Sequence, residues 1–261
     1  MSLFQIQIPE LVTWQRKGRK KEEVLGAFRG RSGGAILGLF LTFALPSMLT
    51  GMLMGFGHGF NLALFTSKFG AQSAYTIANW VGFIAIVALL KRKLGIQLND
   101  LGFRHGLTKV DILAIIGFAA AGIGLFIGLD YLFVQLGMGM PAMEYHITGA
   151  GDLIPLVIYA VISAPICEES FFRAYGINCL RGLSNRTWLA VLISLIGFGA
   201  IHLFSHGLRG FIEIGLIWGI LPSVLYLWRK NIYPGITMHS LNNLFFYIIV
   251  PLYIPSLALA S

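Results

Sequence analysis

Residues 112–136 have the sequence ILAIIGFAAAGIGLFIGLDYLFVQL, in which Asp130 is the single charged side chain. A helix needs about 20 apolar residues to cross the hydrocarbon core of a bilayer, and this run exceeds that length. The composition agrees, because 56% of the 261 residues are hydrophobic and 11% are charged, whereas a soluble protein has about 25% charged residues. The sequence therefore predicts an integral membrane protein.

Six further apolar runs have the length of spanning helices. They lie at about residues 33–56, 72–90, 153–181, 187–204, 210–228 and 233–254, and Pro46 interrupts the first of them. We predict an all-α, polytopic transmembrane bundle of about seven to eight spans, with residues 33–261 as one transmembrane domain. Residues 1–32 form a basic cytoplasmic or interfacial segment, for which a helix and a solvated tail both remain open.

The basic residues predict the orientation of the bundle. With a cytoplasmic N-terminus, sixteen of the nineteen Lys and Arg residues lie inside, two lie outside, and Arg173 falls within a span. Such a bias is typical of membrane proteins with this orientation. It also accounts for the net charge of +8, so we expect the lipid bilayer as a partner and no nucleic acid. The chain has no cleavable signal segment, which suggests a prokaryotic plasma membrane.

The fourth predicted span contains Glu168, Glu169 and Arg173. Ionisable groups inside a membrane are costly and usually functional. Glu169 and Arg173 are four residues apart, so they are expected to form a helical ion pair. Glu168 projects about 100° away from Glu169 and has no such partner. We therefore predict that Glu169 is structural and that Glu168 is a general base, with Pro165 opening the helix backbone nearby.

The fifth predicted span contains His202, with Phe198 one turn earlier on the same face. The turn between the fourth and fifth spans centres near Asn185, which lies 17 residues after Glu168 and 17 before His202. Because antiparallel helices rise equally, Glu168 and His202 are expected at one depth. Together they would form a pair able to bind a water molecule.

The seventh predicted span contains His239 and Asn243, four residues apart on one face. Both side chains donate hydrogen bonds, so the pair suits an oxyanion hole. A hydrogen-bonded pair that joins helices is the alternative. We expect His206 in a loop or at an edge, in contact with solvent, and Asp130 and Glu213 at the membrane interface near helix ends.

Two other kinds of site remain open. Glu168, His202 and His239 supply the two histidines and one carboxylate of some metal sites, although the His-Glu-x-x-His motif of zinc proteases is absent. Cys167 is a candidate nucleophile beside Glu168, but buried cysteines are usually small apolar residues. We therefore predict a site without metal or cofactor.

Three motifs on these spans resemble those of a known membrane family. Residues 168–173 match Glu-Glu-x-x-x-Arg, residues 198–202 match Phe-x-x-x-His, and residues 239–243 match His-x-x-x-Asn. In this order they resemble the CAAX protease and bacteriocin-processing (CPBP, or Abi) family. The resemblance implies a catalytic core at about residues 150–250.

The resemblance also implies a glutamic intramembrane endopeptidase, related to the type II CAAX prenyl endopeptidase. Its catalytic residues would be Glu168 and His202, which activate water, and His239 and Asn243, which bind the oxyanion. Glu169, Arg173 and Phe198 would support them. The substrate would be a membrane-embedded or lipid-associated peptide or protein. A non-catalytic immunity or partner-binding protein, a metal-dependent protease and a small transporter are the alternatives.

Overall fold

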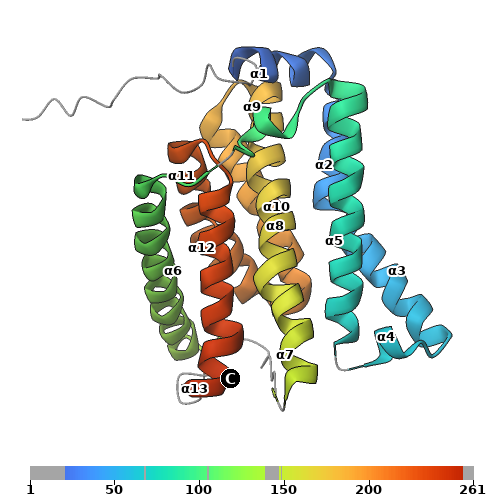
Figure 1. Cartoon of the computed structure of the whole chain (residues 1–261), viewed down its shortest axis with the longest axis vertical. Helices are drawn as coiled ribbons and strands as arrows, with labels where there is room; N and C mark the ends of the chain where they lie inside the picture. Colours follow the sequence, from blue (N-terminus) through green and yellow to red (C-terminus); the bar gives the residue numbers. More distant parts are fainter. Residues whose placement is uncertain (1–20, 68, 105, 139–146, 148, 255–261) are drawn as a thin grey trace, which may run out of the picture.

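The computed structural model describes residues 21–67, 69–104, 106–138, 147 and 149–254. These residues form helices joined by loops, with no strand in the described ranges, and the helices stand side by side as a bundle (Figure 1). Five helices are long and apolar enough to cross a membrane, and a bent pair forms a sixth span. The predicted all-α polytopic bundle is therefore confirmed.

The first half of the chain supplies one end cap and three spans. Its helices are α1 (Lys21–Gly30), α2 (Ser32–Phe43), α3 (Leu45–Gly59), α4 (Ala63–Thr66), α5 (Gly70–Leu89), η1 (Leu90–Leu94), η2 (Leu98–Leu101) and α6 (Lys109–Gln135).

The second half supplies the remaining spans, which contain several wide π-helical turns. Its helices are α7 (Ala150–Leu156), η3 (Val157–Ser163), α8 (Ala164–Glu168), η4 (Glu169–Ile177), α9 (Asn178–Ser184), α10 (Thr187–Gly210), η5 (Phe211–Trp218), α11 (Ile220–Arg229), α12 (Tyr233–Leu244), η6 (Phe245–Ile249) and α13 (Val250–Tyr253).

Each of the seven predicted spans lies on a helix. The first consists of α2 and α3, which are bent by 44°, and Pro46 lies in the first turn of α3. The fourth runs without a break from Ala150 to Ser184 through α7, η3, α8, η4 and α9. The fifth, Thr187–Leu203, is apolar but shorter than the others.

The fifth and sixth spans form a tight antiparallel hairpin. Gly207 turns the chain with a φ of 65°, a value that side chains other than glycine rarely adopt. Gly199 of α10 and Gly215 of η5 then meet so closely that a Cβ on Gly215 would overlap the Gly199 backbone. Small residues allow this approach, as in other membrane helix pairs.

The basic residues gather at one end of the bundle. Helix α1 lies across this end, where η1, α9 and the end of α11 also lie, while α4, α7 and α13 lie at the other end (Figure 1). Val24, Leu25 and Phe28 of α1 are buried, so residues 21–30 are a packed helix and not a solvated tail. The layout is the one that the positive-inside rule requires of a chain with a cytoplasmic N-terminus.

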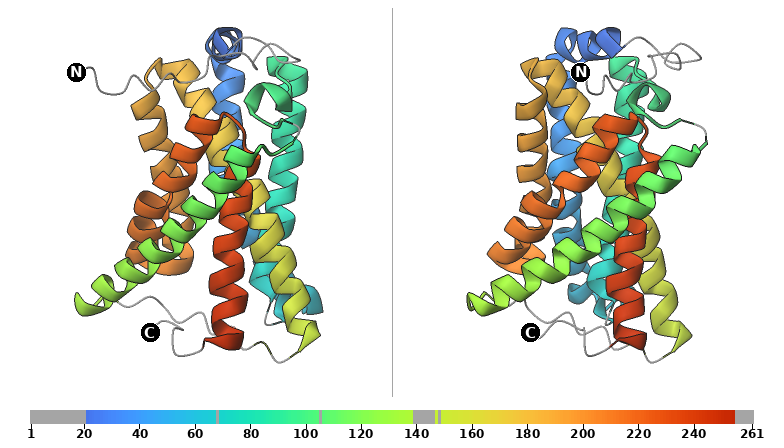
Figure 2. Two further views of the ribbon diagram at one scale, coloured as in Figure 1. Left: turned by 60° about the vertical axis from the view of Figure 1, so that its left-hand side comes forward. Right: turned by 90° about the vertical axis from the view of Figure 1, so that its left-hand side faces the viewer.

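Helix α6 crosses α12 obliquely on one side of the bundle (Figure 2). Asn242 of α12 bridges this crossing, since its Nδ2 donates to the Ala119 carbonyl over 2.9 Å and its Oδ1 accepts from Trp218 Nε1 over 2.9 Å. These hydrogen bonds fix the rotation of α12, and therefore the direction in which its other polar side chains point.

The expectation that His206 is solvated is wrong, and Asp130 and Glu213 do not lie at an open interface. All three are buried, and Glu213 has no exposed surface. The reason is Arg209, which is itself buried and forms ion pairs with both Asp130 and Glu213. Because the guanidinium neutralises these carboxylates, the end of α6 and the turn at Gly207 can pack against each other in the bundle.

Candidate active site

The fourth span is distorted just before Glu168. The Ala164 N–H bonds the Tyr159 carbonyl, five residues back, and Pro165 has no N–H to continue that register. The carbonyl that Pro165 would reach in this register belongs to Ala160, and Asn243 Nδ2 donates to it over 2.8 Å. Asn243 thus satisfies a carbonyl left free by Pro165, a role that its motif spacing did not predict.

Glu169 and Arg173 form the ion pair that their spacing predicts. Arg173 Nη1 lies 3.2 Å from Glu169 Oε1, and neither side chain has any exposed surface. The other guanidinium nitrogens donate to the Gly219 carbonyl over 3.0 Å and to Ser223 Oγ over 3.4 Å. The guanidinium also lies 4.3 Å from the centre of the Phe198 ring. Each guanidinium nitrogen of Arg173 therefore has a partner other than Glu168.

His239 lies between the two glutamates. Its Nδ1 is 2.9 Å from Glu169 Oε1, and its Nε2 is 3.9 Å from Glu168 Oε2. The Glu169 carboxylate, paired with Arg173, can only accept a hydrogen bond, so His239 carries a proton on Nδ1. Glu169 thereby sets the orientation of the ring and turns Nε2 toward Glu168. The sequence analysis did not predict this hydrogen bond between His239 and Glu169.

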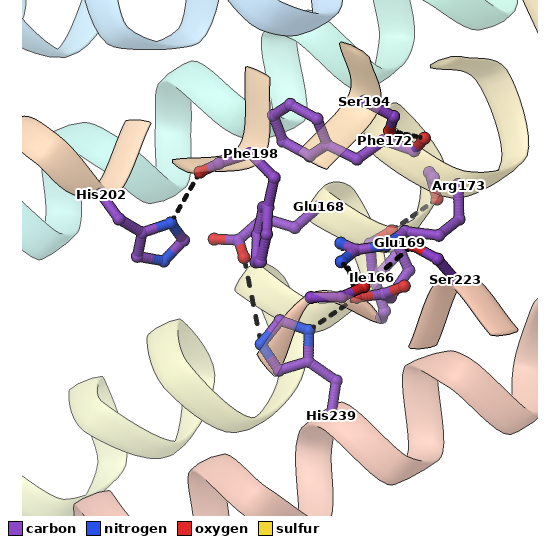
Figure 3. A network of polar contacts seen from close by, with 12 residues as sticks. Ile166, Glu168, Glu169, Phe172, Arg173, Ser194, Phe198, His202, Ser223 and His239 are labelled. Atoms are coloured by element: carbon purple, nitrogen blue, oxygen red, sulfur yellow. Dashed lines mark hydrogen bonds and ion pairs between the residues drawn. The ribbon is translucent and has the colours of Figure 1, made fainter. Parts of the chain in front are cut away.

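Glu168 is 4% exposed, and its hydrogen-bond partner lies on another span. The Tyr75 hydroxyl, from α5, donates to its Oε1 over 3.1 Å. Its other oxygen, Oε2, faces His239 across a gap that is too long for a direct hydrogen bond. In Figure 3 the carboxylate points into the space between the His202 and His239 rings.

His202 approaches Glu168 from the opposite side to His239 (Figure 3). Its Nδ1 lies 2.9 Å from the Phe198 carbonyl, and since a carbonyl only accepts, Nδ1 carries the proton and Nε2 of a neutral ring is an acceptor. The Phe198 ring packs edge-on against both histidines, with centroids 4.6 Å from His202 and 6.5 Å from His239. Glu168, His202 and His239 thus lie around the supporting residues Glu169, Arg173 and Phe198. Asn243 instead contacts Ala160, which is on the same span as Glu168.

A family model matches this region. Residues 150–245 match the family described as "Type II CAAX prenyl endopeptidase Rce1-like". This part of the chain is therefore similar to the CPBP family of CAAX proteases. No curated protein and no solved structure matches the chain. The matched residues contain all four candidate catalytic residues, and they exclude α5.

Tyr75 therefore lies outside the segment that resembles the CPBP family. In the sequence it is one of nine tyrosines and stands in an apolar span without a motif. A tyrosine in a predicted span does not indicate by itself which neighbouring helix its hydroxyl reaches. The contact arises from the packing of α5 against the fourth span, where Tyr75 and Tyr159 also meet edge to face at 5.9 Å.

The residues of the metal alternative are arranged differently from a metal site. Within the described ranges, no three His, Cys, Asp or Glu side chains lie close enough together to hold one ion, and Glu168, His202 and His239 are not such a group. Cys167, the candidate nucleophile, is fully buried. The groups available for chemistry in the described residues are therefore the Glu168 carboxylate and the imidazoles of His202 and His239, whose orientations are set by hydrogen bonds.

Proposed function

We propose that this chain is a glutamic intramembrane endopeptidase that cleaves a peptide bond of a membrane-embedded or lipid-associated peptide or protein. The observation that carries the proposal is the position of Glu168: a buried carboxylate that forms no ion pair with a Lys or Arg of the described residues, with one oxygen held by Tyr75 and the other facing His239. The match of residues 150–245 to a protease family supports the same reaction class.

Glu168 acts as the general base in this proposal. It takes a proton from a water molecule while the water oxygen attacks the carbonyl carbon of the scissile bond, and the carbonyl electrons move to oxygen. His202 helps to hold that water, because Nε2 of its neutral ring is an acceptor. When the C–N bond breaks, the proton on Glu168 passes to the leaving nitrogen, which departs as an amine, and the carboxylate of Glu168 is restored.

His239 and Asn243 stabilise the oxyanion in this proposal. Because the Nδ1 proton of His239 is donated to Glu169, donation from Nε2 requires a ring that is protonated on both nitrogens. The amide nitrogen of Asn243 carries two hydrogens, and its contact with Ala160 uses one of them. The second is left for the substrate. A preorganised donor of this kind typically contributes about 10²–10³-fold in rate.

The decisive experiment replaces Glu168 by glutamine, which has nearly the same shape but cannot act as a base. Membrane peptides are compared by mass spectrometry in cells that express the wild-type chain, Glu168→Gln, or Glu213→Gln, each normalised to folded protein. Glu213 is the matched control, since it is a fully buried glutamate of another span. We expect product peptides to fall about 10²–10⁴-fold in Glu168→Gln and to persist in Glu213→Gln. Wild-type product levels in Glu168→Gln would refute the mechanism.

The metal-dependent alternative is tested on the same products. Activity of the purified protein toward a peptide that spans the observed cleavage site should survive EDTA. Loss of that activity in EDTA and its return with zinc would replace the proposed glutamic mechanism by a metal-dependent one.

A further inference from the structure

Helix α5 meets the fourth span through two side-chain hydrogen bonds of equal length. The Tyr75 hydroxyl donates to Glu168 Oε1 over 3.1 Å, and Trp80 Nε1 donates to Ser163 Oγ over 3.1 Å. Both donors lie outside residues 150–245, the segment that matches the protease family. One bond ends on the proposed base, and the other ends on a hydroxyl that takes no part in the chemistry.

The acceptor of the first bond has few other partners. A carboxylate has about four lone-pair positions, and in the described part of the chain the Tyr75 hydroxyl is the one hydrogen-bond donor to Glu168. Arg173 is committed to Glu169, Gly219 and Ser223, and His239 Nε2 stands 3.9 Å away. The direction of the Glu168 carboxylate therefore depends on Tyr75.

We propose that Tyr75 is a positioning residue for Glu168: its hydroxyl holds Oε1, so that Oε2 stays turned toward His239 and the attacking water. This inference rests on the proposed function. A carboxylate that rotates about its last bond presents either oxygen in either direction, and a fixed donor on one oxygen removes that freedom. The neutral hydroxyl orients the base without neutralising it, which a buried cation at the same place would do.

Tyr75→Phe removes the hydroxyl and keeps the ring that packs on Tyr159. Its matched control is Ser163→Ala, which removes the other bond between α5 and the fourth span. With a synthetic peptide that spans the observed cleavage site, we expect Tyr75→Phe to lower kcat about 10- to 100-fold, because hydrogen bonds to charged groups are among the stronger ones. KM should stay unchanged, and Ser163→Ala should retain the wild-type kcat.

Two results would overturn the inference. A wild-type kcat in Tyr75→Phe would show that the hydroxyl has no effect on the base. An equal loss in Tyr75→Phe and Ser163→Ala would show that both bonds only attach α5. Activity of Glu168→Gln is measured beside them, because a fully active Glu168→Gln would refute the proposed function itself and not merely the role of Tyr75.

A spectroscopic measurement tests the contact without substrate. The infrared carboxylate band of Glu168 is assigned by its disappearance in Glu168→Gln. We expect this band to shift in Tyr75→Phe and to stay in place in Ser163→Ala. A band that does not respond to Tyr75→Phe would overturn the inference even if the protein cleaves peptides as proposed.

Discussion

Around Arg173, one side chain organises groups from three spans. Its guanidinium contacts Glu169 on its own span, the Phe198 ring on α10, and Gly219 and Ser223 at the start of α11. Glu169 then bonds His239 on α12. The pair that the sequence assigned to holding one helix therefore also orients an imidazole of the site, because a carboxylate oxygen can accept more than one hydrogen bond.

Replacing Arg173 by methionine should destabilise the protein more than the same change at an ion pair that water can reach. Removal of one partner leaves Glu169 buried and uncompensated, which costs about 3–5 kcal/mol. The control is Arg229→Met, because the Arg229 side chain is 21% exposed and its partner Asp111 also accepts hydrogen bonds from Thr108. The free energy of unfolding of both variants is measured at equilibrium in mixed micelles. Equal losses would contradict the fully buried environment of Arg173.

At the scale of elements, the site depends on irregular helix geometry. Pro165 and the π-helical turns η3 and η4 widen the fourth span on both sides of Glu168. Such turns are often found at functional sites. The hairpin of α10 and η5 lies close by, and its glycine crossing allows Phe198 and His202 to approach the fourth span. A regular helix in either place would rotate the polar side chains away from each other.

The glycine crossing predicts a sharp size limit at Gly215. A methyl group there would overlap the backbone of Gly199, so Gly215→Ala should destabilise the protein by about 1–3 kcal/mol. The matched control is Gly128→Ala in α6, where an added Cβ meets nothing within 4 Å. That change should be neutral or slightly stabilising, since alanine favours helices. The free energy of unfolding of both variants is measured in mixed micelles. An unchanged value for Gly215→Ala would contradict the tight crossing.

At the scale of the whole molecule, charge and connectivity define two different ends. Helix α1 and η1 lie at the basic end, and α4 lies at the opposite end (Figure 1). A Lys or Arg in a short loop resists translocation across the membrane. The arrangement therefore favours a cytoplasmic basic end, with α4 on the outer side.

Cysteine labelling tests this orientation. Leu64 of α4 is 54% exposed and Lys93 of η1 is exposed, whereas Cys167 and Cys179 are buried. A membrane-impermeant maleimide should label Leu64→Cys in intact cells and should label Lys93→Cys only after the membrane is permeabilised. The reverse pattern would show that the bundle is inserted the other way round.

The spans and the order of the motifs followed from the sequence, because hydropathy, residue spacing and loop charge are properties of contiguous segments. The burial of Asp130 and Glu213 could not be predicted in this way, because it depends on the ion pairs that both carboxylates form with Arg209. The sequence also contained no sign of the hydrogen-bond donor to Glu168. This donor is Tyr75, which lies 93 residues away in the sequence. A contact between such distant residues cannot be predicted from the spacing within one helix.

By itself, the sequence determined a membrane bundle with acid, imidazole and amide groups on three late spans. The tertiary structure decided which atom of each group faces which neighbour: Glu168 Oε1 toward Tyr75, His239 Nδ1 toward Glu169, and Asn243 toward the Ala160 carbonyl. The physical reason is that periodicity along one helix sets which residues share a face, whereas the rotation of that face relative to other helices is set by packing between distant segments.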